Sequence, residues 1–144
     1  SPGAAVTLAQ RRSGAIGRGG MVWDGAFALA DHLLSEGPPP APRGGALRVL
    51  DVSTGAGLTA CALARHWECE VVATDIASVL PLLRENVAAN AAGSLGRVVD
   101  VAEQDWGAVL SPAVASHGPY DLVLAADCVA SVYDGAALAD TLLA

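Results

Sequence analysis

The chain has 144 residues, a length typical of one domain, and 53% of them are hydrophobic. Its formal net charge is −7, and its eight basic residues are all arginine, which excludes a catalytic lysine. Because an acidic surface repels phosphates, we expect no nucleic-acid partner. No apolar run approaches the roughly 18 residues of a membrane span, so we expect no membrane partner either.

Three cysteines, Cys61, Cys69 and Cys128, are present, and their spacing resembles neither a metal site nor a redox pair. A small secreted domain would use more cysteines to form disulfides. We therefore expect reduced thiols, no bound metal and a cytoplasmic protein.

The beginning of the chain carries little periodic signal. Residues 1–21 are rich in glycine and arginine, which predicts a flexible N-terminal arm. Between Asp24 and Leu34 the apolar residues recur with the spacing of one helix face, which predicts a short helix. The proline-rich stretch 37–42 can be neither helix nor central strand, and it predicts an extended linker.

Strands and helices then alternate along the chain. The predicted order is strand Leu47–Val52, helix Leu58–Trp67, strand Glu70–Thr74, a helix capped by Ser78 and ended by Gly93, strand Arg97–Val101, a loop or short helix, strand Tyr120–Ala125, and a helix from about Gly135 to Leu143. Such alternation implies right-handed crossovers between parallel strands. We therefore predict an α/β, Rossmann-like open parallel sheet with helices on both faces.

A loop of small residues follows the first predicted strand, within Leu-Asp-Val-Ser-Thr-Gly-Ala-Gly-Leu at 50–58. Gly55 and Gly57 would let the backbone approach a ligand, and the following helix offers unpaired N–H groups. The second predicted strand leads into Asp75, whose carboxylate can accept hydrogen bonds from two ribose hydroxyls. The sequence therefore predicts a nucleotide-type cofactor site.

Two cofactors fit this loop. Residues 55–60 match the dinucleotide fingerprint G-x-G-x-x-G/A, and Asp75 lies about where that fingerprint has its ribose acid, which alone would suggest an NAD-dependent oxidoreductase. Asp51, however, would repel a pyrophosphate in the turn, whereas it suits a cationic amine such as that of S-adenosylmethionine. We favour S-adenosylmethionine and keep NAD as the alternative.

The pattern formed by Asp51, Ser53, Gly55 and Gly57 resembles that of the seven-strand (class I) S-adenosylmethionine-dependent methyltransferases. The resemblance extends to the lysine methyltransferase-like branch called methyltransferase family 16. Further matches to this branch, in the right order, are Val22-Trp23-Asp24-Gly25-Ala26, Thr74-Asp75, Leu82-Leu83-Arg84-Glu85-Asn86 with Asn90, Trp106-Gly107, and the strand that ends at Asp127. The resemblance therefore covers residues 22–127.

This resemblance implies a cofactor-binding role for five residues around the loop. Asp51 would hold the methionine amine of the cofactor. Gly55 and Gly57 would let its methionine and ribose lie over the loop, beside Ser53. Asp75 would bind both ribose hydroxyls.

Four more residues receive roles by the same resemblance. Asp105 and Trp106 would border the adenine, as an acceptor for its amino group and as a flat apolar wall. Trp23 would close the cofactor or acceptor side. Asp127 would face the methyl-acceptor nitrogen and is the catalytic candidate. Each residue also has a plain structural alternative, such as a helix cap or a core aromatic.

Two positions depart from the family pattern. Ser53 replaces the first glycine of the loop, which is tolerable if its backbone angles are ordinary. In Asp127-Cys128-Val129-Ala130 the expected aromatic is missing, and Tyr133 follows three residues later. Because this motif shapes the acceptor site in the family, a degenerate, non-catalytic cofactor-binding or interaction module remains the alternative.

The family fold continues through three further strands, whereas this chain ends at Ala144. We therefore expect residues 22–144 to form the cofactor-binding part of a truncated class I methyltransferase fold with strand order 3-2-1-4. Strand four would be an open apolar edge, available for self-association or a partner. The resemblance implies S-adenosylmethionine-dependent methylation of a protein lysine.

Overall fold

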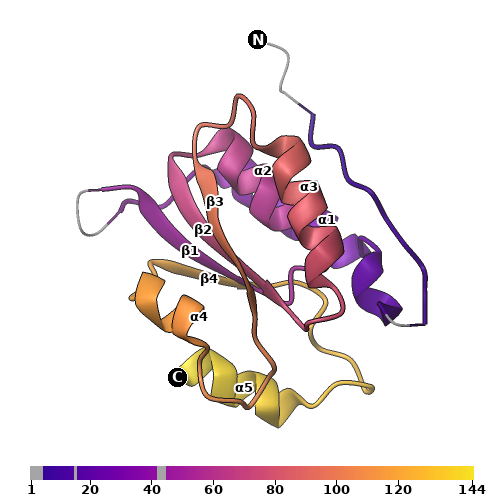
Figure 1. Cartoon of the computed structure of the whole chain (residues 1–144). Helices are drawn as coiled ribbons and strands as arrows, with labels where there is room; N and C mark the ends of the chain where they lie inside the picture. Colours follow the sequence, from indigo (N-terminus) through magenta and orange to yellow (C-terminus); the bar gives the residue numbers. More distant parts are fainter. Residues whose placement is uncertain (1–4, 15, 42–44) are drawn as a thin grey trace.

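Four parallel strands form an open sheet in the order β3-β2-β1-β4 (Figure 1). The structure is a computed structural model that describes residues 5–14, 16–41 and 45–144. Residues 1–4 and Ala15 of the predicted arm, and Pro42 of the predicted linker, lie outside the described residues. The strands are β1 (Leu47–Val52), β2 (Cys69–Asp75), β3 (Arg97–Glu103) and β4 (Leu122–Ala125). The predicted strand order is confirmed.

Helices cover both faces of this sheet, which confirms the predicted Rossmann-like architecture (Figure 1). They are η1 (Gly17–Gly20), α1 (Asp24–Glu36), α2 (Leu58–His66), α3 (Leu80–Asn90), α4 (Pro112–His117) and α5 (Gly135–Leu143). Residues of α1, α2 and α3 pack in one apolar core with alternate strand residues. Residues of α4 and α5 form a second core on the opposite face.

The central strand β1 shows why the strand sequences are continuous apolar runs. Val49 pairs with Val71 on one side and with Leu122 on the other, so β1 has a neighbour at both edges. Val49 lies in the core under α2, whereas the next residue, Leu50, lies in the opposite core. Because helices cover both faces, successive side chains of β1 are buried in turn.

Some predicted element ends are wrong. Ser78 does not cap α3, because the helix begins after Val79 and has no side-chain cap. The helix ends at Asn90, before Gly93. The last strand starts at Leu122 rather than Tyr120, whose hydroxyl instead donates a hydrogen bond of 2.6 Å to the Val114 carbonyl of α4.

The part of the chain before α1 packs along α3 (Figure 1). We call residues 5–14 and 16–21 the strap. Thr7 and Ala9 of the strap form hydrogen bonds with the side chains of Asn90 and Asn86. The flexibility predicted for this arm stays a prediction.

The strand β4 lies at the edge of the sheet, as expected, and Val123 is 44% exposed there. Association through this edge stays a prediction. Among the helices that the structure describes, none has the length and apolar character needed to cross a membrane.

Leu83 tests how the core supports the loop after β1. Its side chain is fully buried, and its Cδ1 lies 2.6 Å from the position that a Cβ on Gly57 would take. Replacement by alanine leaves a cavity under the loop, so Leu83→Ala should lower the free energy of unfolding by about 2–5 kcal/mol. The exposed Leu95 is the control, and Leu95→Ala should change stability by less than about 0.5 kcal/mol. Urea unfolding followed by circular dichroism measures both free energies. Equal effects of the two substitutions would contradict the role of Leu83 as a core support of the loop.

Candidate cofactor site at the carboxyl ends of the strands

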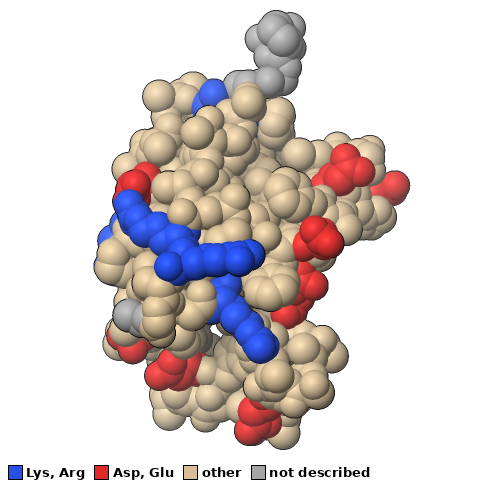
Figure 2. All heavy atoms as spheres, turned by 90° about the vertical axis from the view of Figure 1, so that its right-hand side faces the viewer, with Lys and Arg blue, Asp and Glu red and all other residues tan. Residues whose placement is uncertain are grey.

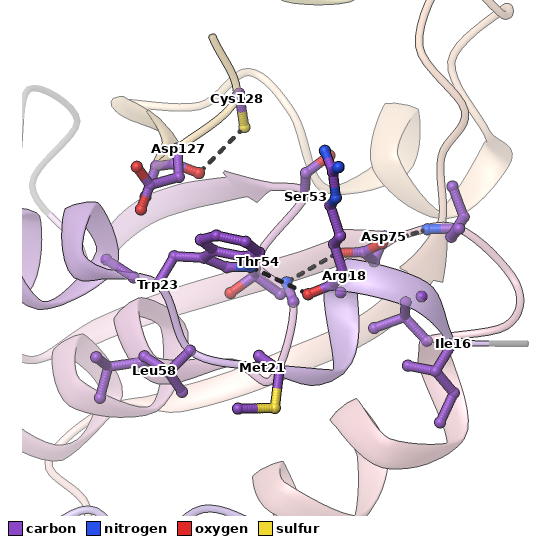
Figure 3. Close-up of a pocket in the computed structure, with 18 of the residues that line it drawn as sticks. Ile16, Arg18, Met21, Trp23, Ser53, Thr54, Leu58, Asp75, Asp127 and Cys128 are labelled. Carbon is purple, nitrogen blue, oxygen red and sulfur yellow. Dashed lines mark hydrogen bonds between the residues drawn. The ribbon is translucent and has the colours of Figure 1, made fainter. Parts of the chain in front are cut away.

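A cavity of about 680 Å³ lies at the edge of the sheet where the parallel strands end (Figure 3). This volume falls in the range of small-molecule sites. Ser53, Asp75, Asp105 and Asp127 line it, and each stands at or just after the end of a different strand. Because the sheet is parallel, all four strand ends meet at this edge.

Seven of the nine predicted site residues line the cavity. They are Trp23, Ser53, Gly55, Asp75, Asp105, Trp106 and Asp127. Asp51 and Gly57 do not line it. The structure therefore brings together most of the residues that the sequence singled out, although they span more than 100 positions.

Asp75 joins the end of β2 to the loop after β1. Its Oδ2 accepts a hydrogen bond of 2.8 Å from the Gly55 N–H, and its Oδ1 accepts one of 2.8 Å from the Ile76 N–H. Burial raises the pKa of Asp75, and these two backbone hydrogen bonds oppose that rise. Each carboxylate oxygen has a second lone pair, so both can still accept a ligand hydroxyl.

Asp51 lies beneath the loop and is fully buried. Its Oδ2 accepts hydrogen bonds from the hydroxyls of Thr54, at 2.6 Å, and Thr59. Its Oδ1 has no hydrogen-bond partner within the described ranges. Burial raises the pKa of Asp51 from 3.8 to about 6 despite the two threonine bonds. Asp51 thus supports the loop from below, and its role toward a cofactor amine stays a prediction.

Ser53 does not meet the condition under which serine would be tolerable in place of the family glycine, because its backbone angles are not ordinary. Its φ is +55°, in the left-handed region that glycine tolerates best, at a cost for serine of about 1 kcal/mol. Its hydroxyl accepts a hydrogen bond of 2.8 Å from Nε1 of Trp106. A glycine at this position would have no side chain to make that contact.

Gly55 allows a close approach, as the sequence predicts. The group that comes close in this structure is the backbone of the strap, not a ligand. Its φ is +60°, and a Cβ there would lie 3.1 Å from the carbonyl oxygen of Gly19 in the strap. A side chain at Gly55 would therefore push against the strap. Contact of Gly55 with a cofactor stays a prediction.

Two aromatic rings form one wall of the cavity. Trp106 and Tyr133 are edge to face, with ring centroids 5.5 Å apart and an interplanar angle of 68°. Tyr133 is the aromatic that the sequence shows displaced from its family position, yet it lines the cavity. The neighbouring Asp105 is exposed and lines the same cavity.

Asp127 is tied to the start of α1. Its Oδ2 accepts a hydrogen bond of 2.6 Å from the Gly25 N–H, one of the unpaired donors in the first turn of that helix. A Cβ on Gly25 would lie 2.5–2.6 Å from the carboxylate atoms, so only glycine leaves room for this contact. Trp23 lies just before the helix, and its Nε1 donates a hydrogen bond of 3.0 Å to the Arg18 carbonyl. The motif around Trp23 and the end of β4 thus form one unit.

Sequence reasoning missed the contribution of the strap. Ile16, Arg18, Gly19 and Met21 line the cavity, and Figure 3 shows three of them as labelled sticks beside the loop residues. The glycines among residues 17–20, directly before the matched motif, are the signal that could have pointed there.

Cys128 was also missed as a lining residue. Its pKa is raised to about 11 by burial and by the negative charges of Asp51, Asp75 and Asp127. The thiol therefore stays protonated near neutral pH, which makes it a poor nucleophile.

A second cavity, of about 530 Å³, borders the first one. Both are lined by Arg18 and Trp23, and Arg12 lines only the second. Arginine side chains gather on this face of the molecule (Figure 2). Arg11 forms an ion pair of 2.6 Å with Glu85, whereas Arg12 and Arg18 have no ion pair with any other described residue.

The buried Asp51 makes stability depend on pH in a direction that can be worked out. Its pKa is about 6 in the folded chain and near 3.8 when exposed, so the folded state binds the extra proton between these values. The contribution of Asp51 to the free energy of unfolding is therefore largest below about pH 4. It falls by on the order of 3 kcal/mol as the pH rises to about 6. Asp51→Asn should show a smaller fall, to which the buried Asp75 still contributes, whereas Asp140→Asn, on the surface of α5, should keep the full fall. Urea unfolding at pH 4.5 to 7.5 measures the slopes, and identical slopes for both variants would contradict the burial argument.

Comparison with known proteins agrees with the resemblance seen in the motifs. The family described as lysine methyltransferase matches residues 3–144. Ribosomal protein L11 methyltransferase of Rhodopseudomonas palustris (strain BisB5) is 35% identical over 102 residues, which cover 70% of this chain and 30% of that protein. The crystal structure of a candidate O-methyltransferase from Nostoc punctiforme PCC 73102 is 26% identical, covers 56% of this chain and 21% of that one, and has a TM-score of 0.37.

The chain thus matches less than a third of the length of either relative. The family match, in contrast, includes the strap, all four strands and the last helix. On that match, the protein belongs to the lysine methyltransferase family.

Proposed function

We propose that this protein binds S-adenosylmethionine in the 680 Å³ cavity and takes part in methyl transfer to a lysine side chain of another protein. The observation that carries the proposal is Asp75, a carboxylate at the cavity wall whose two oxygens each hold one backbone N–H and keep a lone pair for a ribose hydroxyl. Family membership supplies the class of chemistry.

The charges that line the cavity support this cofactor over NAD. The carboxylates are Asp75, Asp105 and Asp127, and the one cation among the described lining residues is Arg18. The buried Asp51 adds a further acid below the loop. A cationic ligand with hydroxyl groups suits this balance, whereas the pyrophosphate of a dinucleotide would meet like charges.

The wall formed by Trp106 and Tyr133 suits a flat heteroaromatic ring. Trp106 is fixed on two sides, by the hydrogen bond to Ser53 and by the edge-to-face contact with Tyr133. Because its orientation is set before a ligand arrives, little side-chain freedom is lost on binding. We assign the adenine to this wall, next to Asp105.

S-adenosylmethionine supplies a methyl group already activated by a sulfonium, so the protein mainly has to align a neutral nitrogen with it. Asp127 is the candidate for orienting that amine, because its carboxylate lines the cavity and is fixed by the Gly25 N–H. Trp23, which is 47% exposed, borders both cavities and would shape the approach of the acceptor.

Two findings support a protein lysine as the target. The matched family is described as lysine methyltransferase, and the relative from Rhodopseudomonas palustris is named for a ribosomal protein. Asp127 favours one second candidate, a cofactor-binding module without methyl transfer, because its Oδ2 already caps α1. The two candidates predict the same cofactor binding and differ only in transfer.

Asp75→Ala tests the cofactor assignment. It removes both acceptors for the ribose and the anchor of Gly55, so the affinity for S-adenosylhomocysteine should fall at least about 100-fold, as expected for two hydrogen bonds to a charged group. Isothermal titration calorimetry gives the dissociation constants. Asp140→Ala serves as the surface control and should bind like the unchanged chain. Equal affinity in a folded Asp75→Ala protein would contradict the assignment.

Gly25→Ala tests the role of Asp127 without touching the cofactor residues. The new Cβ would lie within 2.6 Å of the carboxylate, so Asp127 must move. Methyl transfer should then fall about 100-fold, the effect of a misplacement near 1 Å, while S-adenosylhomocysteine affinity stays within about threefold. Mass spectrometry of purified ribosomal protein L11 after incubation with S-adenosylmethionine reports transfer. Undiminished transfer by Gly25→Ala would remove Asp127 from the reaction, and binding without transfer by the unchanged chain would favour the non-catalytic module.

A further inference from the structure

Two asparagines on one face of α3 hold the strap in the same way. Asn86 Oδ1 accepts a hydrogen bond of 2.8 Å from the Ala9 N–H, and its Nδ2 donates one of 3.0 Å to the Ala9 carbonyl. Asn90 makes the equivalent pair with Thr7, at 3.0 and 2.8 Å. Both asparagines are buried. The strap is therefore fixed to α3 by two side chains that each bind both the N–H and the carbonyl of one strap residue.

The two asparagines differ in their remaining donor. Nδ2 of Asn86 donates a hydrogen bond of 2.8 Å to the carbonyl of Ala56, in the middle of the loop after β1. Nδ2 of Asn90 donates instead to the backbone carbonyl of Asn86, one turn earlier in its own helix, at 2.7 Å. Asn86 thus connects the strap to the loop, and Asn90 connects it to α3 only.

Ten residues after Ala9, the strap crosses the same loop. A Cβ on Gly19 would lie 2.5 Å from Cγ2 of Val79, and the Gly19 carbonyl lies 3.1 Å from the Cβ position of Gly55. Gly19 belongs to η1, and residues 17–19 of this helix line the cavity. In Figure 3 the labelled strap residues and Thr54 of the loop surround the same space. A ligand that fills the cavity would therefore contact both segments.

We propose that Asn86 is a positioning residue for the cofactor: by binding Ala9 and Ala56 together, it fixes the strap and the loop in one relative position and so sets the affinity of the cavity. The inference rests on the proposed function in that the cofactor is S-adenosylmethionine. Its physical basis is preorganisation, because two walls that are already joined lose little freedom when a ligand binds between them. Asn86 does not line the cavity, so its effect is indirect.

Asn86→Asp and Asn90→Asp form a matched pair that isolates this effect. Each variant replaces a buried NH2 group that donates two hydrogen bonds by an oxygen that, in the ionised aspartate, cannot donate, so both should destabilise the fold to a similar extent. Only Asn86→Asp repels the loop carbonyl. For S-adenosylhomocysteine we expect the dissociation constant to rise about 10-fold in Asn86→Asp and less than about threefold in Asn90→Asp, the effect of one hydrogen bond of about 1.4 kcal/mol. Isothermal titration calorimetry measures the affinities, and urea unfolding measures stability.

Hydrogen exchange of the ligand-free protein gives a readout that does not depend on the cofactor. Asn86→Asp should speed exchange at the strap and at the Gly55 and Gly57 amides, which are hydrogen-bonded in the closed loop. Asn90→Asp should speed it at the strap alone. If either aspartate variant fails to fold, Asn86→Ser and Asn90→Ser replace the pair without adding a charge.

Two outcomes would overturn the inference: equal changes in affinity for the matched variants, or loop exchange that is the same in both. A third outcome would instead contradict the proposed function and leave this inference standing. If the unchanged chain does not bind S-adenosylhomocysteine but the loop amides respond to Asn86→Asp only, the coupling of strap and loop stands and the cofactor assignment fails.

Discussion

The loop after β1 is fastened to the rest of the molecule on three sides, and the form of the cavity depends on these attachments. The Gly55 N–H binds Asp75, the Ala56 carbonyl binds Asn86, and the Thr54 hydroxyl binds Asp51 from below. The loop has positive φ angles at residues 53, 55 and 57, which an unsupported chain would rarely keep. A backbone with such angles persists only where several independent contacts with its surroundings hold it in place.

Asp127 both supports the fold and lines the cavity. Its own φ is +54°, and its carboxylate caps a helix that lies about 100 residues earlier in the chain. A negative group at a helix N-terminus is stabilised by the helix dipole and by the free N–H groups there. The bond therefore holds the loop after β4 against α1, and residues of both segments line the cavity. A carboxylate at the end of a strand can therefore stabilise the fold and still be available to a ligand in the cavity.

The parts of the structure that depend on local sequence were predictable, whereas contacts between distant segments were not. The strands could be predicted because each is a short apolar run, and parallel connections must collect Asp75 and Asp127 at one edge of the sheet. The strap could not, because its hydrogen bonds to Asn86 and Asn90 span 77 and 83 positions and leave no periodic trace. The angle of Ser53 was equally hidden, since serine does not signal a left-handed backbone.

The two acids at the ends of β1 and β2 looked alike in the sequence and differ in the structure. Asp51 is followed by one more strand residue and points into the protein beneath the loop, whereas Asp75 ends β2 and reaches the cavity. Burial raises the pKa of both, and the charge of Asp75 raises that of Asp51 further. Nearby positive charge shifts such groups back toward their ionised forms, and added negative charge raises their pKa still more. A cationic ligand beside them would be stabilised by the same two acids that would oppose a phosphate. The burial of Asp51 and Asp75 therefore supports the proposed S-adenosylmethionine over NAD, two cofactors that fit the glycine loop equally well.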